Sequence, residues 1–153
     1  MCIRDSLEPF VTRTVETLDQ ALTAYFMKRP VDIYAELQSA DKFVKGQALE
    51  AFAIYIMRLL GLRFVDWRKR GTETGGTELD VIMTGQFGPV PTVWQIWCKN
   101  TPSGRVRLGD IAKEVGLVPQ TSATHIMFLA NCPISRDAVR FAREVIQLSL
   151  IHI

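Results

Sequence analysis

Residues 75–80 read Gly-Gly-Thr-Glu-Leu-Asp, and residues 94–100 read Trp-Gln-Ile-Trp-Cys-Lys-Asn. The first segment follows a glycine-bounded loop and begins an apolar strand. Asp80 directly precedes the apolar residues of that strand. The second segment is itself an apolar strand, and Lys99 closes it. If the two strands are antiparallel neighbours, Asp80 and Lys99 come within side-chain reach of each other. These two isolated polar groups guide the interpretation of the whole chain.

Apolar residues recur at helical spacing before these strands. They predict helices over residues 7–28, 31–38 and 43–60. The first helix stops before Arg29 and Pro30, because the residue before a proline avoids the helical conformation. Gly61 is a natural stop for the third helix. Glu50 is the one acidic residue near the middle of that helix.

The rest of the chain alternates between strand and helix patterns. Strands are predicted over residues 62–69, 78–83, 92–100 and 125–130, and a helix over residues 108–117. A last helix is predicted after Ser135 as N-cap, with its apolar positions between residues 138 and 145. Residues 85–91 carry two glycines and two prolines and are predicted to be a turn or loop. The order from the third helix on is helix, three strands, helix, strand, helix, which indicates an α/β domain.

Carboxylates beside a lysine at one sheet end suit a hard divalent cation. Glu50, from the preceding helix, adds a second carboxylate to that of Asp80. Mg²⁺ prefers oxygen ligands and keeps several waters, so one or two carboxylates are enough. Such an ion polarises a phosphodiester and activates a bound water, while Lys99 orients that water or offsets the growing negative charge. Each residue alone has a structural explanation in a helix surface, a turn or a strand end, but jointly they favour a nuclease site.

At these residues the sequence resembles the PD-(D/E)XK nuclease superfamily, and within it the Mrr-like restriction endonucleases. The resemblance runs over roughly residues 45–145. Its motifs are Gly-Gln-Ala-Leu-Glu at 46–50, Gly-Gly-Thr-Glu-Leu-Asp at 75–80, Trp-Cys-Lys-Asn at 97–100, Ala-Lys-Glu-Val-Gly at 112–116 and Thr-His-Ile-Met at 124–127. The resemblance implies a restriction-endonuclease-like α/β fold, with a mixed four-stranded sheet flanked by helices in an α-β-β-β-α-β-α core. It also implies dependence on Mg²⁺ or Mn²⁺ and hydrolysis of double-stranded DNA, in prokaryotic restriction or genome defence.

The resemblance assigns roles to the site residues but leaves one position open. Glu50 and Asp80 would be metal ligands, and Lys99 the water-positioning or charge-stabilising group. The family has an acid or a glutamine two residues before the lysine, where this sequence has Trp97. Gln95 shares its strand face but lies ~6.6 Å too early, so it substitutes only if a bulge shifts the register. Glu78 and the backbone carbonyl of Cys98 are the other candidate oxygen donors.

Five basic residues are candidates for DNA contacts, and they are Arg68, Lys69, Arg70, Arg105 and Arg107. Such residues are ordinary solvated surface unless the nuclease interpretation holds, in which case they form a phosphate-contacting rim. Trp94 and Trp97 are expected to pack against the sheet rather than to stack on bases.

Composition excludes several other classes of protein. The chain has 153 residues, 48% of them hydrophobic, and a formal charge of +2, which fits one globular domain. Three cysteines without a C-x-x-C pair and two histidines exclude a disulfide framework, a zinc ribbon and a zinc protease of the H-E-x-x-H type. The apolar segments are too short for a membrane span, so a cytoplasmic location is expected.

The two ends resemble translated sequencing-adapter sequence, as found at the ends of assembled environmental reads. We therefore divide the chain into adapter-like residues 1–6 and 148–153, an N-terminal helical extension over residues 7–40 and a nuclease core over residues 41–147. Two other hypotheses remain. The chain is either a catalytically degenerate module that binds DNA or a partner, or a fragment of a larger defence protein. A homodimer is a further possibility.

Overall fold

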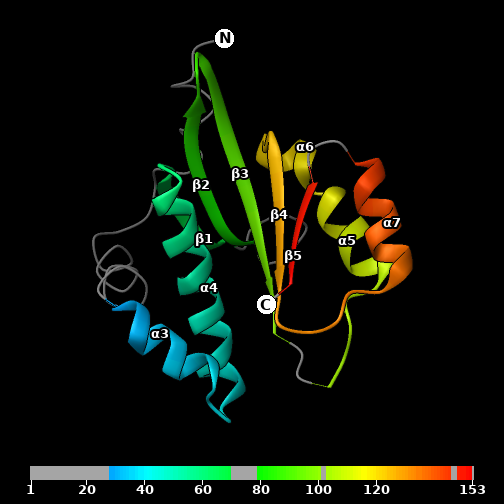
Figure 1. The fold of residues 1–153 in the computed structure, drawn as a ribbon. Helices are drawn as coiled ribbons and strands as arrows, with labels where there is room; N and C mark the ends of the chain where they lie inside the picture. The colour runs from blue at the N-terminus through cyan, green and yellow to red at the C-terminus, as the bar shows by residue number, and fades with distance from the viewer. Residues whose placement is uncertain (1–27, 70–78, 101–102, 146–147, 153) are drawn as a thin grey trace.

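The computed structural model describes residues 28–69, 79–100, 103–145 and 148–152. One mixed β-sheet lies between two groups of helices, with α3 and α4 on one face and α5, α6 and α7 on the other (Figure 1). In chain order the elements are α3 (Pro30–Leu37), α4 (Lys42–Leu59), β1 (Arg63–Lys69), β2 (Leu79–Phe87), β3 (Val90–Lys99), α5 (Leu108–Val115), α6 (Val118–Thr121), β4 (His125–Ala130), α7 (Arg136–Glu144) and β5 (Leu148–His152).

The sheet is mixed, as predicted. Its strands follow the order β1-β2-β3-β4-β5, and the pairs β1–β2 and β2–β3 are antiparallel, whereas β3–β4 and β4–β5 are parallel. The four predicted strands are β1 to β4, so the mixed four-stranded part of the predicted α/β core is confirmed. The fifth strand was not predicted, because residues 148–153 were set aside as adapter-like. Strand pairing does not bear on the origin of those residues, which stays a prediction. The helix predicted over residues 7–28 falls almost wholly outside the described residues.

Helix α4 is delimited by signals in its own sequence. The Asp41 side chain caps its start by accepting hydrogen bonds from the backbone N–H groups of Phe43, at 2.7 Å, and Val44, at 3.3 Å. At the other end Gly61 adopts a left-handed φ of +83°, and its N–H donates to the Arg58 carbonyl. With the bond from Leu62 N–H to the Met57 carbonyl this forms a Schellman motif, which confirms Gly61 as the stop.

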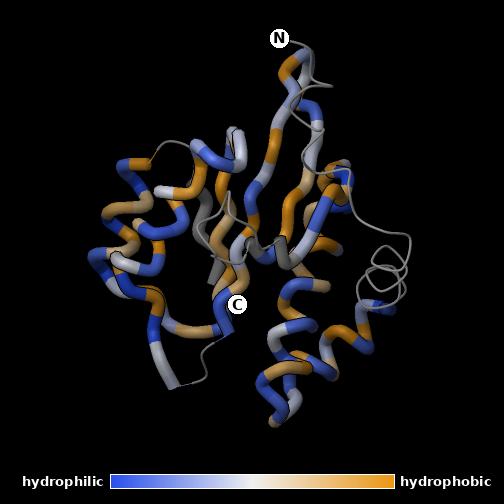
Figure 2. Tube along the Cα trace, turned by 180° about the vertical axis from the view of Figure 1, so that it is seen from behind, coloured by the Kyte–Doolittle hydropathy of each residue, from blue (hydrophilic) through white to orange (hydrophobic). Residues whose placement is uncertain are grey.

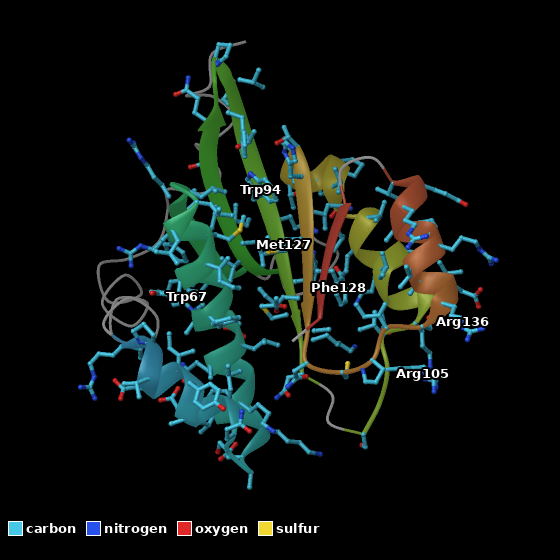
Figure 3. The ribbon with its side chains drawn as sticks, viewed as in Figure 1. Trp67, Trp94, Arg105, Met127, Phe128 and Arg136 are labelled. Atoms are coloured by element: carbon cyan, nitrogen blue, oxygen red, sulfur yellow. The ribbon has the colours of Figure 1, made fainter. Side chains whose placement is uncertain are left out.

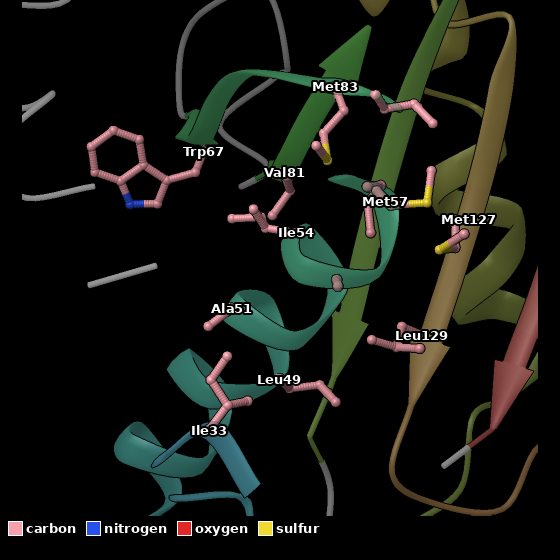
Figure 4. Close-up of a cluster of buried hydrophobic side chains, with 13 residues drawn as sticks. Ile33, Leu49, Ala51, Ile54, Met57, Trp67, Val81, Met83, Met127 and Leu129 are labelled. Carbon is pink, nitrogen blue, oxygen red and sulfur yellow. The ribbon is translucent and has the colours of Figure 1, made fainter. Parts of the chain in front are cut away.

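Two apolar cores lie on the two faces of the sheet. The first joins α3 and α4 to the strands and includes Leu49, Ile54, Met57, Ile96 and Met127 (Figure 4). The second lies under α5 and α7 and includes Ile82, Trp97, Ile111, Phe128 and Ala138. Adjacent strand residues alternate between the cores, because successive side chains point to opposite faces. In Figure 2 hydrophobic residues recur along the strands and along the helices that cover them.

The β2–β3 hairpin is longer than the sequence predicted. Residues 85–91, predicted as a loop, continue both strands and pair from Gly85–Thr92 to Phe87–Val90. Gly88, at φ +58°, makes the turn. Gly85 serves packing instead, since a Cβ there would lie 3.0 Å from Cγ of Leu62. Among the described residues no helix is both long and apolar enough to cross a bilayer.

Candidate active site

The candidate site lies where β2 and β3 part. Their ladder runs from the hairpin to the pair Val81–Ile96, and both strands continue beyond it. Past this point the backbone N–H of Cys98 donates to Oδ2 of Asp80, at 2.6 Å, so a side-chain carboxylate accepts the bond in place of a strand carbonyl. In an antiparallel pair the N–H and C=O of one residue point to the same neighbour. The Cys98 carbonyl therefore lies on the side of Asp80.

Asp80 and Lys99 lie on the same face of the sheet. Ile82 pairs with Gln95 across the two strands, and both side chains point toward α5. Asp80 is two residues from Ile82 and Lys99 is four from Gln95, so strand alternation places both on that face. Both charges also act on one carboxyl group of α5, that of Glu114.

Glu50 belongs to the helix on the opposite face of the sheet, and its charge acts on Cys98 at this strand end. It belongs to α4, and only 7% of its surface is exposed. Burial raises the pKa of the Cys98 thiol well above its ordinary value, and the nearby charges of Asp80 and Glu50 raise it further. Two hydrogen bonds of Asn100 fix the start of α4 here, since its Nδ2 donates to the Lys42 carbonyl at 3.0 Å and its Oδ1 accepts from Asn131 at 2.6 Å.

The start of α5 holds the Lys99 amine. Nζ of Lys99 lies 3.2 Å from Oδ1 of Asp110, and Oδ2 of Asp110 accepts the backbone N–H of Arg107 at 2.8 Å. Burial acts to raise the pKa of Asp110, but the bonds from the Arg107 N–H and from Lys99 outweigh it and lower the pKa overall. Asp110 thus stays ionised and orients the amine.

Glu114 is a functional candidate to which the sequence analysis gave no role. It lies one helical turn after Asp110, is 7% exposed, and its Oε2 has no hydrogen-bond partner among the described residues. Burial raises its pKa from 4.5 to about 8; Asp80 and Asp110 raise it too, while Lys113 and Lys99 act in the opposite direction. The signal in the sequence was a single acid within the Ala-Lys-Glu-Val-Gly motif, on a helix whose packing the sequence does not reveal.

Gln95 is held in the core instead of at the site. β3 pairs with β2 and with β4 without any register shift, so the bulge that Gln95 required does not occur along this strand. The side chain is fully buried, its Oε1 accepts from Thr121 Oγ1 at 2.7 Å, and its Nε2 donates to the Glu114 carbonyl at 3.3 Å. Both ends of the amide are therefore engaged in fastening α5 and α6 to the sheet.

The two tryptophans of β3 serve packing, as expected. Trp97 is 7% exposed within the second core, and its Nε1 has no partner in the described part of the chain. Trp94 stacks on the ring of His125 from β4, with ring centroids 4.6 Å apart and an angle of 14° between the planes. Position 97 consequently offers an apolar ring where the family that this chain resembles has an oxygen donor.

Only part of the predicted basic rim falls within the described residues. Arg70, Glu78 and the side chains of Arg68 and Lys69 lie outside them. Arg105 and Arg107 are exposed, and the bridge between Val106 and Ile134 sets them beside the start of α7. In Figure 3 Arg105 and Arg136 lie near each other.

Helix α7 extends this basic surface. Arg136, Arg140 and Arg143 recur at helical spacing and are exposed. They were not among the basic residues predicted to contact DNA, although their spacing of four and three residues was the available signal. We name Arg105, Arg107, Arg136, Arg140 and Arg143 the arginine surface.

The raised pKa of Glu114 predicts a pH dependence of stability. Between pH 4.5 and about 8 the native state keeps the Glu114 proton that the unfolded chain has lost. The free energy of unfolding contributed by this group therefore falls as the pH rises through that window. Glu114→Gln removes this contribution. Without divalent ions, the Tm of Glu114→Gln minus the Tm of the parent should therefore be higher at about pH 8 than at pH 4.5, by about 3 °C or more. Glu36→Gln on α3 is the matched control, and a constant difference between Glu114→Gln and the parent at every pH would contradict the assignment.

Residues 42–153 match the model of the Mrr_cat family, described as restriction endonuclease. No curated protein matches the sequence. The protein of unknown function AF1548 is 15% identical over 66% of this chain and 54% of its own, with a TM-score of 0.54. The MspJI restriction endonuclease, in complex with a 27-mer oligonucleotide, is 20% identical over 82% of this chain and 30% of its own, with a TM-score of 0.53. The DNA modification-dependent restriction endonuclease AspBHI is 14% identical over 93% of this chain and 36% of its own, with a TM-score of 0.57.

At these identities the structural likeness shows a shared fold. The chain spans between 30% and 54% of the length of the solved chains that it resembles.

Proposed function

The chain belongs to the Mrr_cat family of restriction endonucleases, and from this premise we propose that it is a DNA endonuclease dependent on Mg²⁺ or Mn²⁺. One observation carries the proposal. Asp80 and Lys99 stand on one face of the sheet at the point where β2 and β3 separate, and the Asp80 carboxylate is held there by the Cys98 N–H at 2.6 Å.

The residues present fit a cation that keeps most of its water. The described residues contain no group of three His, Cys, Asp or Glu side chains that could hold a metal ion. Mg²⁺ needs only one or two carboxylates, because waters and the substrate phosphate complete its octahedron. Burial of a carboxyl oxygen without a partner, as in Glu114, also suits a pocket that receives a cation.

Each residue then has a distinct task. Asp80 and Glu50 would hold the cation, with the Cys98 carbonyl as a further oxygen on the Asp80 side. When bound, the ion polarises the phosphodiester and lowers the pKa of a water ligand. Lys99, oriented by Asp110 at 3.2 Å, would position the attacking water or stabilise the charge that develops on the phosphate oxygens.

Double-stranded DNA is the proposed substrate and partner. The arginine surface would contact its phosphates, since exposed guanidinium groups bind phosphate oxygens in a bidentate manner. The chain spans a minor part of the two solved restriction enzymes that it resembles, so recognition of a sequence or a base modification is assigned to segments outside this domain. We also propose a cytoplasmic role in restriction or genome defence.

Cleavage of supercoiled plasmid tests this function. The expected result is conversion to nicked and linear DNA with Mg²⁺ or Mn²⁺ and none with EDTA. Equal cleavage with and without EDTA would refute the dependence on a divalent cation.

A second function, a degenerate DNA-binding module, is favoured by one observation, the apolar Trp97 in place of an oxygen donor. Binding of the plasmid without cleavage, with either Mg²⁺ or Mn²⁺ present, would favour that alternative.

A further inference from the structure

Position 97 has no oxygen donor, and helix α5 covers this part of β3. Asp110 and Glu114 are four residues apart on α5 and therefore lie on one side of that helix. Asp110 binds the Lys99 amine at 3.2 Å, and the Glu114 carbonyl accepts from Gln95 at 3.3 Å. Lys99 and Gln95 flank Trp97 by two residues on either side along β3. The α5 turn from Asp110 to Glu114 therefore runs over position 97.

The Glu114 carboxyl group is costly as it stands. It is 7% exposed, and Oε2 accepts no hydrogen bond within the described part of the chain. A buried polar atom without a partner destabilises a fold, and the charged form costs more than the neutral one. The charges of Asp80 and Lys99, the two residues that define the candidate site, both act on this carboxyl group, which belongs to the helix that covers the face carrying them.

A cation beside Asp80 would reverse this balance. Two neighbouring carboxylates repel each other, and a bound divalent ion turns that repulsion into shared attraction. The other sources of a second oxygen on this face are restricted. Both ends of the Gln95 amide are engaged, and Glu50 approaches from the opposite face of the sheet.

We propose that Glu114 supplies, from α5, the carboxylate ligand to the divalent cation that Trp97 cannot supply from β3. The ligand position has moved from the strand to the helix that covers it, and Glu114 adds to Asp80 on this face of the sheet. The proposal rests on the proposed function, since it concerns the same cation. It also explains how a site with an apolar residue at position 97 stays competent.

Titration of the protein with Mn²⁺ alone tests the assignment without any need for cleavage. Binding is measured by calorimetry and by the rise in Tm for the parent, Glu114→Gln, Glu114→Asp and Asp80→Asn. Glu36→Gln on α3 is the matched control. We expect Glu114→Gln to weaken Mn²⁺ binding at least about 10-fold. Glu114→Asp, which keeps a carboxylate on a shorter stem, should retain part of the affinity, and Glu36→Gln should bind as the parent does.

The outcomes separate this proposal from the proposed function. If Asp80→Asn loses Mn²⁺ and Glu114→Gln binds like the parent, the Glu114 assignment is overturned while the metal-dependent nuclease stands. If the parent itself shows neither heat nor a change in Tm with Mn²⁺, both fail. Should Glu114→Gln unfold, the Glu114→Asp variant decides. Mn²⁺ affinity below that of the parent at parental Tm supports the assignment, and parental affinity at parental Tm overturns it.

Discussion

Asp80→Asn is expected to reduce DNA cleavage at least about 100-fold while leaving the protein folded. Asparagine keeps an oxygen that can accept the Cys98 N–H, now made at 2.6 Å, so the opening between β2 and β3 should persist. What disappears is the negative charge, and a neutral amide is a much poorer ligand for Mg²⁺ than a carboxylate. Plasmid cleavage rates with Mg²⁺ and with Mn²⁺ measure the loss.

The stability of the same variant supplies the control. The Asp80 charge raises the pKa of Glu114, so its removal relieves a repulsion in the site. The Tm of Asp80→Asn without metal should therefore equal or exceed that of the parent. Asp32→Asn, which breaks an exposed ion pair with Arg29 at 2.8 Å, is the matched change elsewhere and should cleave like the parent. Parental cleavage by a folded Asp80→Asn would remove Asp80 from the mechanism.

Trp97→Ala is expected to lower the free energy of unfolding by about 3–5 kcal/mol. The indole is 7% exposed and packs in the second core with Ile82, Phe128 and the residues of α5 and α7. Its Nε1 makes no hydrogen bond among the described residues, so the loss is one of packing and not of a polar contact. Denaturant unfolding at constant m-value measures it, and a loss below about 1 kcal/mol would show that the site collapses around the smaller side chain.

Trp97→Gln separates the structural role of this residue from a metal-binding defect. The sequence alone suggests that an oxygen restored here tightens Mg²⁺ binding. If Glu114 already provides the ligand, the substitution costs stability and adds no affinity. Tighter binding by a folded Trp97→Gln protein would instead show that the parent site lacks a ligand, in favour of the degenerate module.

The order of the elements was determined by local sequence patterns. Helix α4 was predictable because Asp41, the apolar stripe and Gly61 act within a few residues of one another. The strands β1 to β4 were predictable for the same reason, since runs of β-branched and aromatic residues fit a pleated, buried surface. Asp80 and Lys99 were recognisable because each is a polar residue on an otherwise apolar strand.

Features that depend on distant contacts could not be predicted in this way. Gly85 was interpreted as a loop residue, yet it pairs with Thr92 in β2, and its missing side chain leaves room for Leu62. Strand β5 forms only by pairing with β4, and α6 is a single short turn held to the sheet through Gln95 and Thr121.

In the candidate site, too, some features depend on local sequence and others on distant contacts. The sequence by itself determined the strands and the two residues on them, Asp80 and Lys99, because strand alternation is a local property. Only the tertiary structure decided that Gln95 fastens α5 and α6 to the sheet and that Glu114 is buried on the face of the sheet that carries Asp80. The angle and depth at which α5 packs set both outcomes, and these follow from side chains of the second core, which come from segments far apart in the chain.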